Sequence, residues 1–190
     1  MRDNIKDCKI VRIDNVNEYY RYYFKEYPTY ISICWWEREY SYTNFWWLII
    51  MKKDFDNRAL YHELVHYNIQ KILLLEPYKY IGLYIKIKEL RNKIRRLCLN
   101  KELYFNLLNV EEKKFVNSLC GMDFIINKYY KEFLSDDEYV AYQVPFLLKF
   151  NDDWTVSFVY NIRDIKNRNL RDIIKLYQQI DKLIFKHIIF

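Results

Sequence analysis

Glycine and proline are scarce in this chain of 190 residues, which contains two glycines and three prolines. Tight turns therefore depend on Asn and Asp, which adopt left-handed backbone conformations more readily than most residues. The sequence also lacks Gly/Ser-rich stretches, internal repeats and low-complexity segments, so nothing marks a linker. We expect a single domain over residues 1–190, which is long enough to bury a core without disulfides.

Cysteine is also sparse, and none of the four residues forms a CxxC pair: they are Cys8, Cys34, Cys98 and Cys120. The N-terminal residues are charged and lack the apolar core of a signal peptide. Together these features predict reduced thiols and a cytoplasmic location. The longest apolar run, Phe45 to Met51, is far shorter than the roughly 20 residues that cross a bilayer, so we expect no membrane segment.

The formal net charge of +6 permits an acidic partner without requiring one. The most basic segment, residues 86–96, reads KIKELRNKIRR and could contact phosphates. However, Ile87, Leu90 and Ile94 recur in it at helical spacing, which favours a helix with one buried and one solvated face. No helix-turn-helix, RRM or zinc-finger spacing is present, so we do not expect a nucleic-acid partner.

Hydrophobic periodicity predicts an α+β fold that is mostly helical, with a small sheet. A β-hairpin is expected near residues 30–52, with strands at 30–40 and 45–52 joined by a turn at 41–44, and another strand at 154–160. Helices are expected at about 15–27, 59–75, 80–99, 124–133 and 162–190. Another short helix is expected to begin at Asn109 or Asn106 and to run to Cys120, with Gly121 as a stop signal. In the helix at 80–99, the residues near a 3.6-residue period are Ile81, Tyr84, Ile85, Leu90, Ile94 and Leu97.

Residues 62–66, His-Glu-Leu-Val-His, form an HExxH motif inside the helix expected at 59–75. Residues i and i+4 of a helix share one face, with Cβ atoms about 5–6 Å apart. His62 and His66 can therefore bind one zinc ion at about 2.0–2.1 Å. Glu63 then lies beside the metal and can take a proton from a water molecule. The alternative is a buried helix whose histidines only pack.

With an apolar strand directly before it, the motif helix resembles the active-site helix of the zincin metallopeptidases. The resemblance implies a zinc-dependent peptidase with a zincin-like fold, in which the small sheet precedes the HExxH helix. It also implies that a strand at the edge of the cleft, here 45–52, binds an extended peptide substrate by strand addition. Metzincins have a Gly and a third His after the motif, where this chain has Ile69 and Ile72, so that subgroup is excluded.

Residues 137–142 resemble instead the E-x-x-A-[D/H/Y] pattern of the gluzincins, which implies that Glu138 is the third zinc ligand. Ala141 is small, as close packing of helices requires. Many gluzincins have an Asp that hydrogen-bonds a zinc-binding His, whereas this chain has Tyr142, a weaker acceptor.

Glu138 has a second interpretation, because residues 135–138 also form an S-x-x-E capping box. In that case Glu138 would bond a backbone amide rather than a metal. Asp136 and Asp137 would then be the fallback ligands, and Glu76 a remote one.

The resemblance also implies a mechanism. Zinc lowers the pKa of its water, Glu63 takes the proton, and the resulting hydroxide attacks a carbonyl polarised by zinc. Glu63 then protonates the leaving amine. The oxyanion needs a further donor, and the candidates are Tyr139, Tyr142, Tyr160 and His187. The partner implied is a peptide or protein substrate.

Two other functions stay open from the sequence. The chain could be a non-catalytic interaction protein that keeps a zincin-like or degenerate site, or a nucleic-acid-binding module that uses the basic helix at 86–96. Bound zinc would separate the peptidase from both alternatives. Salt-dependent binding to DNA or RNA would indicate the last one.

Overall fold

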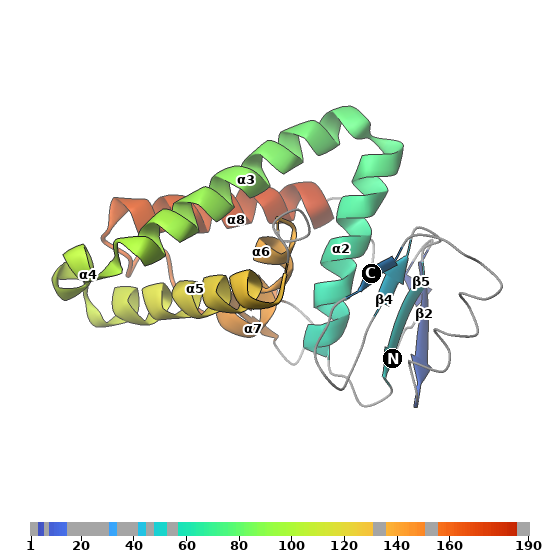
Figure 1. The fold of residues 1–190 in the computed structure, drawn as a ribbon, viewed down its shortest axis with the longest axis horizontal. Coiled ribbons are helices and arrows are strands. Elements are labelled where there is room, and N and C mark those ends of the chain that lie inside the picture. The colour runs from blue at the N-terminus through green and yellow to red at the C-terminus, as the bar shows by residue number, and fades with distance from the viewer. Residues whose placement is uncertain are drawn as a thin grey trace. The chain divides into compact units, whose positions relative to one another are not determined.

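The computed structural model describes residues 4–5, 8–14, 31–33, 42–44, 48–52, 57–130, 136–150 and 156–185. The chain separates into two compact units, residues 1–77 with 184–190 and residues 78–183 (Figure 1). Most of the described residues are helical, and each unit also contains a sheet. The expected α+β, mostly helical fold is confirmed. None of the described helices has the length and apolar composition needed to cross a membrane.

The sheet of the first unit has five short strands in the order β1-β2-β5-β4-β3. They are β1 (Asn4–Ile5), β2 (Cys8–Ile13), β3 (Ile31–Ile33), β4 (Tyr42–Asn44) and β5 (Leu48–Lys52). β2 and β5 are parallel, and the other neighbours are antiparallel. The predicted turn at 41–44 is wrong, because Tyr42–Asn44 is a strand that pairs with both β3 and β5. The expected hairpin is therefore part of a three-stranded meander, to which β2 and β1 are added.

The position of β5 rules out one expectation. β5 pairs with β2 on one side and with β4 on the other, so both of its edges are used for backbone hydrogen bonds. A peptide adds only to a strand with an unpaired edge. Strand addition to residues 48–52 is thus wrong, and the outermost described strands of this sheet are β1 and β3.

The helix that carries the motif, α2 (Asn57–Leu75), agrees with the prediction at 59–75 and lies against the sheet (Figure 1). The β2–β5 register places Ile10 beside Ile49, and both pack against Leu64 and Tyr67 of α2. Since each helical residue turns by about 100°, the motif histidines lie roughly on the face opposite to these two side chains. The sheet contact therefore fixes the direction in which the histidines point.

The second unit is built from helices and one two-stranded sheet. Apart from a few end residues, it contains α3 (Pro77–Leu99), α4 (Lys101–Tyr104), the 3₁₀ helix η1 (Phe105–Leu107), α5 (Val110–Tyr129), α6 (Glu138–Ala141), α7 (Gln143–Leu147), β6 (Leu148–Phe150), β7 (Val156–Phe158) and α8 (Arg168–Phe185). Pro77 begins α3. The N–H groups in the first turn of a helix have no partner within the helix, so the N–H that proline lacks costs no helical hydrogen bond at this position.

The buried face of α3 is only partly the expected one. Its buried residues are Leu83, Ile87, Leu90, Ile94 and Leu97. Ile81 and Ile85 were expected on this face, but they are 56% and 62% exposed. The apolar residues of α3 thus cover more than one face, and periodicity alone chose the wrong one for its first turns.

A capping box starts α5. Asn109 Oδ1 accepts the N–H of Glu112 at 2.9 Å, and Glu112 Oε2 accepts the N–H of Asn109 at 2.9 Å. Of the two starts expected from the sequence, Asn109 and Asn106, the structure has Asn109. The stop at Gly121 is wrong, because the helix continues to Tyr129. A glycine inside a helix costs only about 1 kcal/mol, which the buried face of α5 outweighs. Two predicted helices are therefore one.

Asp181 of α8 is a half-buried carboxyl group of the second unit. Burial raises the pKa of Asp181 on α8 to about 7, although a hydrogen bond from Gln143 opposes this shift. Gln143 Nε2 donates to Asp181 Oδ1 at 2.8 Å, and Gln143 is fully buried. A single neutral donor compensates little of the cost of burying a carboxylate. The carboxyl group is therefore about half protonated at neutral pH.

We expect the substitution Asp181→Asn to stabilise the protein at pH 8. In the unfolded chain the carboxyl loses its proton near the ordinary pKa of 3.8, whereas in the folded chain it loses it near 7. The folded state thus holds one more proton between these values, and stability falls as pH rises through this window. Urea unfolding should show a loss of a few kcal/mol between pH 4 and 8 in the wild type and a flatter profile in the variant. Parallel profiles would show that Asp181 is ionised in the folded state.

Candidate metal centre

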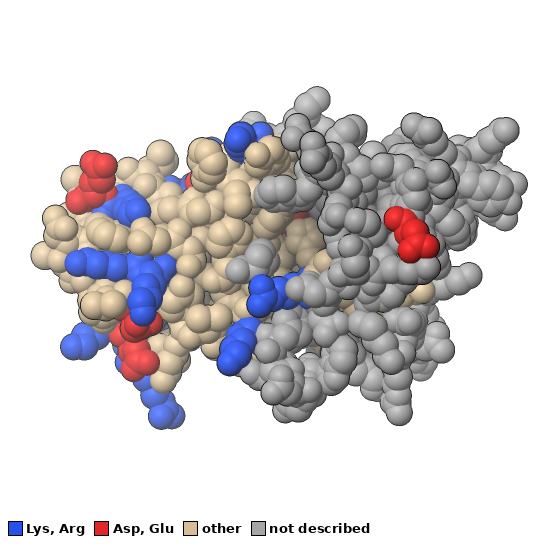
Figure 2. All heavy atoms as spheres, turned by 90° about the horizontal axis from the view of Figure 1, so that it is seen from below, with Lys and Arg blue, Asp and Glu red and all other residues tan. Residues whose placement is uncertain are grey.

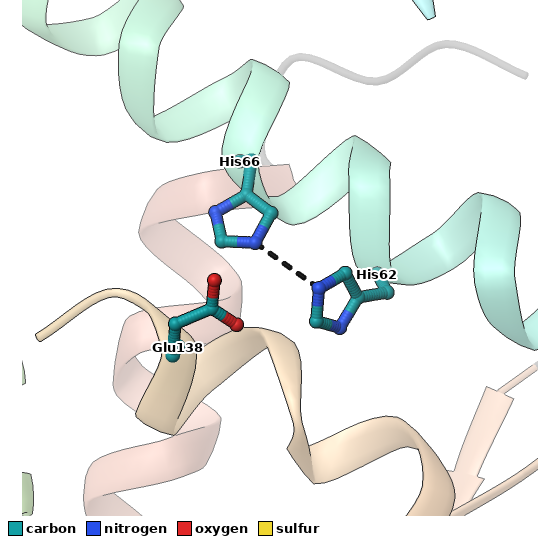
Figure 3. A group of neighbouring side chains, drawn as sticks. All are labelled: His62, His66 and Glu138. Carbon is teal, nitrogen blue, oxygen red and sulfur yellow. Dashed lines mark hydrogen bonds between the residues drawn. The ribbon is translucent and has the colours of Figure 1, made fainter. Parts of the chain in front are cut away.

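The two motif histidines face each other on α2. The Nε2 atoms of His62 and His66 are 3.2 Å apart (Figure 3). The two rings meet edge to face, with centroids 4.8 Å apart and an interplanar angle of 72°. His66 is 1% exposed, and His62 is half-buried. The spacing of four residues thus brings two imidazole nitrogens to one point, as the sequence predicts.

Glu63 follows His62 on the same helix and is 4% exposed. One residue along a helix is a rotation of about 100°, so Glu63 lies to one side of the histidine pair. Leu64 and Val65, the two middle residues of the motif, are also buried. α2 is therefore covered on nearly all sides over residues 61–69, and its polar residues lie in the protein interior.

Glu138 is the first residue of α6 and is 3% exposed. With His62 and His66, which are drawn beside it in Figure 3, it makes up the set of His and Glu residues in the described part of the chain that could hold a metal ion. Two imidazoles and one carboxylate are a donor set found in catalytic zinc sites. The donor chemistry of these side chains therefore fits zinc.

The described start of α6 does not match the capping-box interpretation of Glu138. A capping box requires Glu at the third position of the helix, whereas Glu138 stands at the first. The residue that precedes the helix is Asp137, whose side chain makes no capping hydrogen bond. Ser135, the other half of the predicted box, lies outside the described residues.

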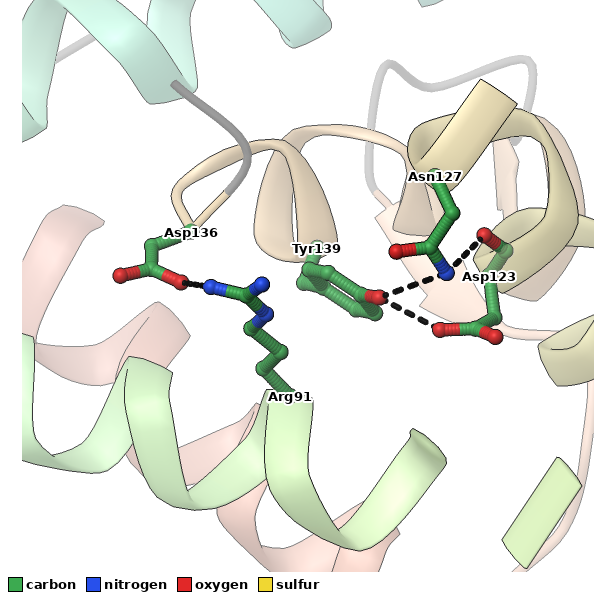
Figure 4. A network of polar contacts seen from close by, with 5 residues as sticks. All are labelled: Arg91, Asp123, Asn127, Asp136 and Tyr139. Atoms are coloured by element: carbon green, nitrogen blue, oxygen red, sulfur yellow. Dashed lines mark hydrogen bonds and ion pairs between the residues drawn. The ribbon is translucent and has the colours of Figure 1, made fainter. Parts of the chain in front are cut away.

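The segment that carries Glu138 is anchored on both sides within the second unit (Figure 4). Before it, Asp136 forms an ion pair with Arg91 of α3, and the two side chains are only 13% and 12% exposed. After it, the hydroxyl of Tyr139 donates to Asp123 of α5. A single helical turn is not stable by itself, so these contacts determine where Glu138 lies in its unit.

Tyr139 is held a second time through its backbone. The hydroxyl of Tyr177 on α8 donates to the carbonyl oxygen of Tyr139 at 3.0 Å. Both tyrosines have less than 2% of their surface exposed. Burial, together with the hydrogen bond to Asp123, raises the pKa of Tyr139. Its hydroxyl therefore stays protonated and acts as a structural donor.

The described oxyanion candidates all have hydroxyls that hydrogen-bond within the second unit. Tyr139 donates to Asp123, Tyr142 bonds the hydroxyl of Tyr130 at 3.0 Å, and Tyr160 bonds that of Ser118 at 2.8 Å. His187 lies outside the described residues. The hydroxyl of Tyr142 was also expected to accept a hydrogen bond from a zinc-binding histidine. Its bond with Tyr130 uses part of that hydrogen-bonding capacity.

The fallback ligands are less suited to a metal than Glu138. Asp136 is engaged with Arg91. Glu76 follows α2 ten residues after His66, which is about 15 Å along a helix axis and too far for a shared ion. Asp137 precedes α6 and is half-buried. None of the three belongs to the ligand group found in the described part of the chain.

The basic segment at 86–96 has the structure of a helix with one buried face. Ile87, Leu90 and Ile94 are buried, as predicted. Several basic side chains have partners within the unit: Lys86 donates to Gln179 at 2.8 Å, and Arg91 pairs with Asp136. Figure 2 shows the molecule from below the view of Figure 1, not the side on which α3 lies, and on this face the described basic residues are interspersed with acidic and uncharged ones.

Comparison of the chain with protein-family models, curated proteins and solved structures finds no match.

We expect Arg91→Ala to destabilise the second unit by about 2 kcal/mol, because it leaves the largely buried Asp136 carboxylate without its cation. Lys93→Ala is the matched control on the same helix. Lys93 pairs with Glu89 at 3.6 Å, but the side chains are 39% and 52% exposed, so its loss should cost about 0.5 kcal/mol or less. Urea unfolding at pH 7 measures both. Equal effects would mean that the Arg91–Asp136 pair does not anchor α6.

Proposed function

We propose that this chain is a zinc-dependent metallohydrolase, a peptidase of the gluzincin type, with His62, His66 and Glu138 as zinc ligands and Glu63 as the general base. One observation carries the proposal: the Nε2 atoms of an HExxH motif point at each other across 3.2 Å on a buried helix. Glu138 supports it, since its carboxylate belongs to the same ligand group.

The nitrogen spacing matches what a tetrahedral zinc ion requires. Two nitrogens at about 2.0–2.1 Å from zinc, separated by a tetrahedral angle, are roughly 3.3 Å apart. The histidine pair, with its Nε2 atoms 3.2 Å apart, is therefore already spaced for a metal.

The same histidine spacing suits a second interpretation. At 3.2 Å one neutral imidazole can donate an N–H to the other, and this hydrogen bond needs no metal. The two interpretations differ in protonation, because a zinc-bound Nε2 carries no hydrogen. Metal uptake by the folded protein therefore decides between them.

A zinc ion held here would supply Lewis acidity, activating a water molecule and polarising a scissile carbonyl. The carboxylate of Glu63 would accept the proton of the attacking water and deliver it to the leaving amine nitrogen. Burial of Glu63 and His66 limits competing water around these groups. The ligands proposed here would leave one position of a four-coordinate ion for water or substrate.

The expected substrate is a peptide or protein, and a cytoplasmic location belongs to the same proposal. Cys98 and Cys120 are both present as thiols, which suits a reducing compartment. Since β5 has no unpaired edge, the proposal does not include strand addition to it.

Metal content tests the ligands. We expect about one zinc per chain in purified wild type by mass spectrometry, loss of zinc in His66→Ala and weaker binding in Glu138→Gln, which keeps the side-chain size but removes the charge. Glu111→Gln, at an exposed position of α5, is the control and should bind like the wild type. Binding should weaken as the pH falls, because protons compete with zinc for the imidazole nitrogens. Protein that contains no zinc and takes up none when zinc is added would overturn the proposal.

Turnover tests the base. We expect Glu63→Gln to bind zinc normally but to cleave a fluorogenic peptide library about 10²–10⁴-fold more slowly than the wild type, because the proton acceptor is lost. His66→Ala supplies the metal-free baseline. A zinc-loaded wild type that cleaves no peptide in the library would argue for the interaction protein with a degenerate site, and unchanged turnover in Glu63→Gln would exclude Glu63 as the base.

A further inference from the structure

Two cysteines of the second unit lie on neighbouring helices. Cys98 is in the last turn of α3 and Cys120 is in the middle of α5. Both are half-buried, and both carry a free thiol. α3 and α5 run in opposite directions and are joined through α4 and η1 (Figure 1). The two thiols are therefore 22 positions apart in sequence but belong to the same helical hairpin.

Contacts beside the cysteines set the register of the two helices. Lys101, three residues after Cys98, donates to Asn117 Oδ1 at 2.6 Å, and Asn117 is three residues before Cys120. In antiparallel helices, a step forward on one corresponds to a step back on the other. Lys101 is the first residue of α4, directly after the end of α3, so its contact with Asn117 places the last turn of α3 beside the part of α5 that contains Cys120. A hydrogen bond between Cys98 and Cys120 agrees with this placement.

The register is consistent on the other side of the cysteines. Arg91 of α3 lies seven residues before Cys98, and its guanidinium is 6.0 Å from the ring centre of Tyr139. Asn127 of α5 lies seven residues after Cys120 and donates to the Tyr139 hydroxyl at 3.5 Å (Figure 4). The two helices thus share a neighbour at the level that the cysteine pairing predicts.

The two thiols are chemically different. A hydrogen bond with Cys120 is the largest cause that raises the pKa of Cys98, and burial adds to it. The same hydrogen bond is the largest cause that lowers the pKa of Cys120, with help from the ammonium group of Lys101 and against burial. Cys120 is therefore the better thiolate and Cys98 the proton donor, the division found in redox-active dithiols.

A metal does not explain the pair. Zinc in a protein usually takes four ligands, of which at least three come from side chains. Within the described residues, no group of three potential ligands includes either cysteine. Each of the two thiols has the other as its hydrogen-bond partner, and no third metal ligand accompanies them in the described part of the chain.

We propose that Cys98 and Cys120 are a thiol–disulfide site, which a small-molecule disulfide such as oxidised glutathione converts to an intramolecular disulfide between α3 and α5. The Cys120 thiolate attacks one sulfur of glutathione disulfide, forming a mixed disulfide and releasing one glutathione. The Cys98 sulfur, after losing its proton, attacks the Cys120 sulfur and releases the second glutathione. Two cysteine thiols are oxidised, one glutathione disulfide is reduced, and the two thiol protons end on the two glutathiones. The proposal does not depend on the zinc site.

The test uses the full-length folded protein treated with oxidised glutathione, quenched with acid and mapped by mass spectrometry. We expect the peptides that contain Cys98 and Cys120 to be joined, with the loss of two hydrogen atoms, and to separate again after dithiothreitol. In Cys98→Ser the glutathione adduct should persist on Cys120. In Cys120→Ser, Cys98 should stay reduced at the same exposure. A stable glutathione adduct on Cys98, or a disulfide that forms only in urea, would overturn the proposal.

A second measurement separates reactivity from packing. The rate at which iodoacetamide alkylates Cys120 should follow an apparent pKa below the ordinary thiol value of about 8.5. Cys98→Ala removes the hydrogen-bond donor and should shift this profile to higher pH. Cys98→Ser keeps a donor and should shift it less. Identical profiles in all three proteins would show that Cys98 does not activate Cys120.

Discussion

The contact between α2 and the β2–β5 pair determines the geometry of the candidate site. Leu64 and Tyr67 pack on Ile10 and Ile49, and this apolar contact sets the rotation of α2 about its axis. The rotation in turn fixes the direction of His62 and His66, because the side chains of a helix are tied to its backbone at about 100° per residue. A polar site on this helix therefore depends on two apolar side chains on the other face.

Features encoded by neighbouring residues were predicted well from the sequence. The motif spacing predicted the convergence of His62 and His66, and 3.6-residue periodicity predicted α2 and α3 within a few residues. The helix predicted from residue 162 begins only at Arg168, as α8. The start of α5 was narrowed to Asn109 or Asn106, because capping depends on side chains close in sequence. One local prediction failed: Gly121 does not stop α5. The packing of the buried face of α5 outweighs the low helix propensity of glycine.

Features that depend on distant partners were not predicted. β4 is a strand because β3 and β5 lie on its two sides, whereas residues 42–44 alone resemble a turn. β5 is internal because β2, far away in sequence, pairs with it. Ile81 and Ile85 are exposed because nothing in the described structure selects their face of α3 for burial. The cysteine pair has no local signal either, since its spacing of 22 positions depends on the register between two helices.

Parallel pairing of β2 with β5 also has a consequence for the order of folding. The two strands are joined by residues 14–47, and during synthesis β2 leaves the ribosome well before its partner. At about 5–20 residues per second, the strand waits several seconds before the sheet can close. The hairpin of α3 and α5 forms from segments closer in sequence, and such local contacts form faster. β2 is thus a segment of the nascent chain that needs protection from premature pairing.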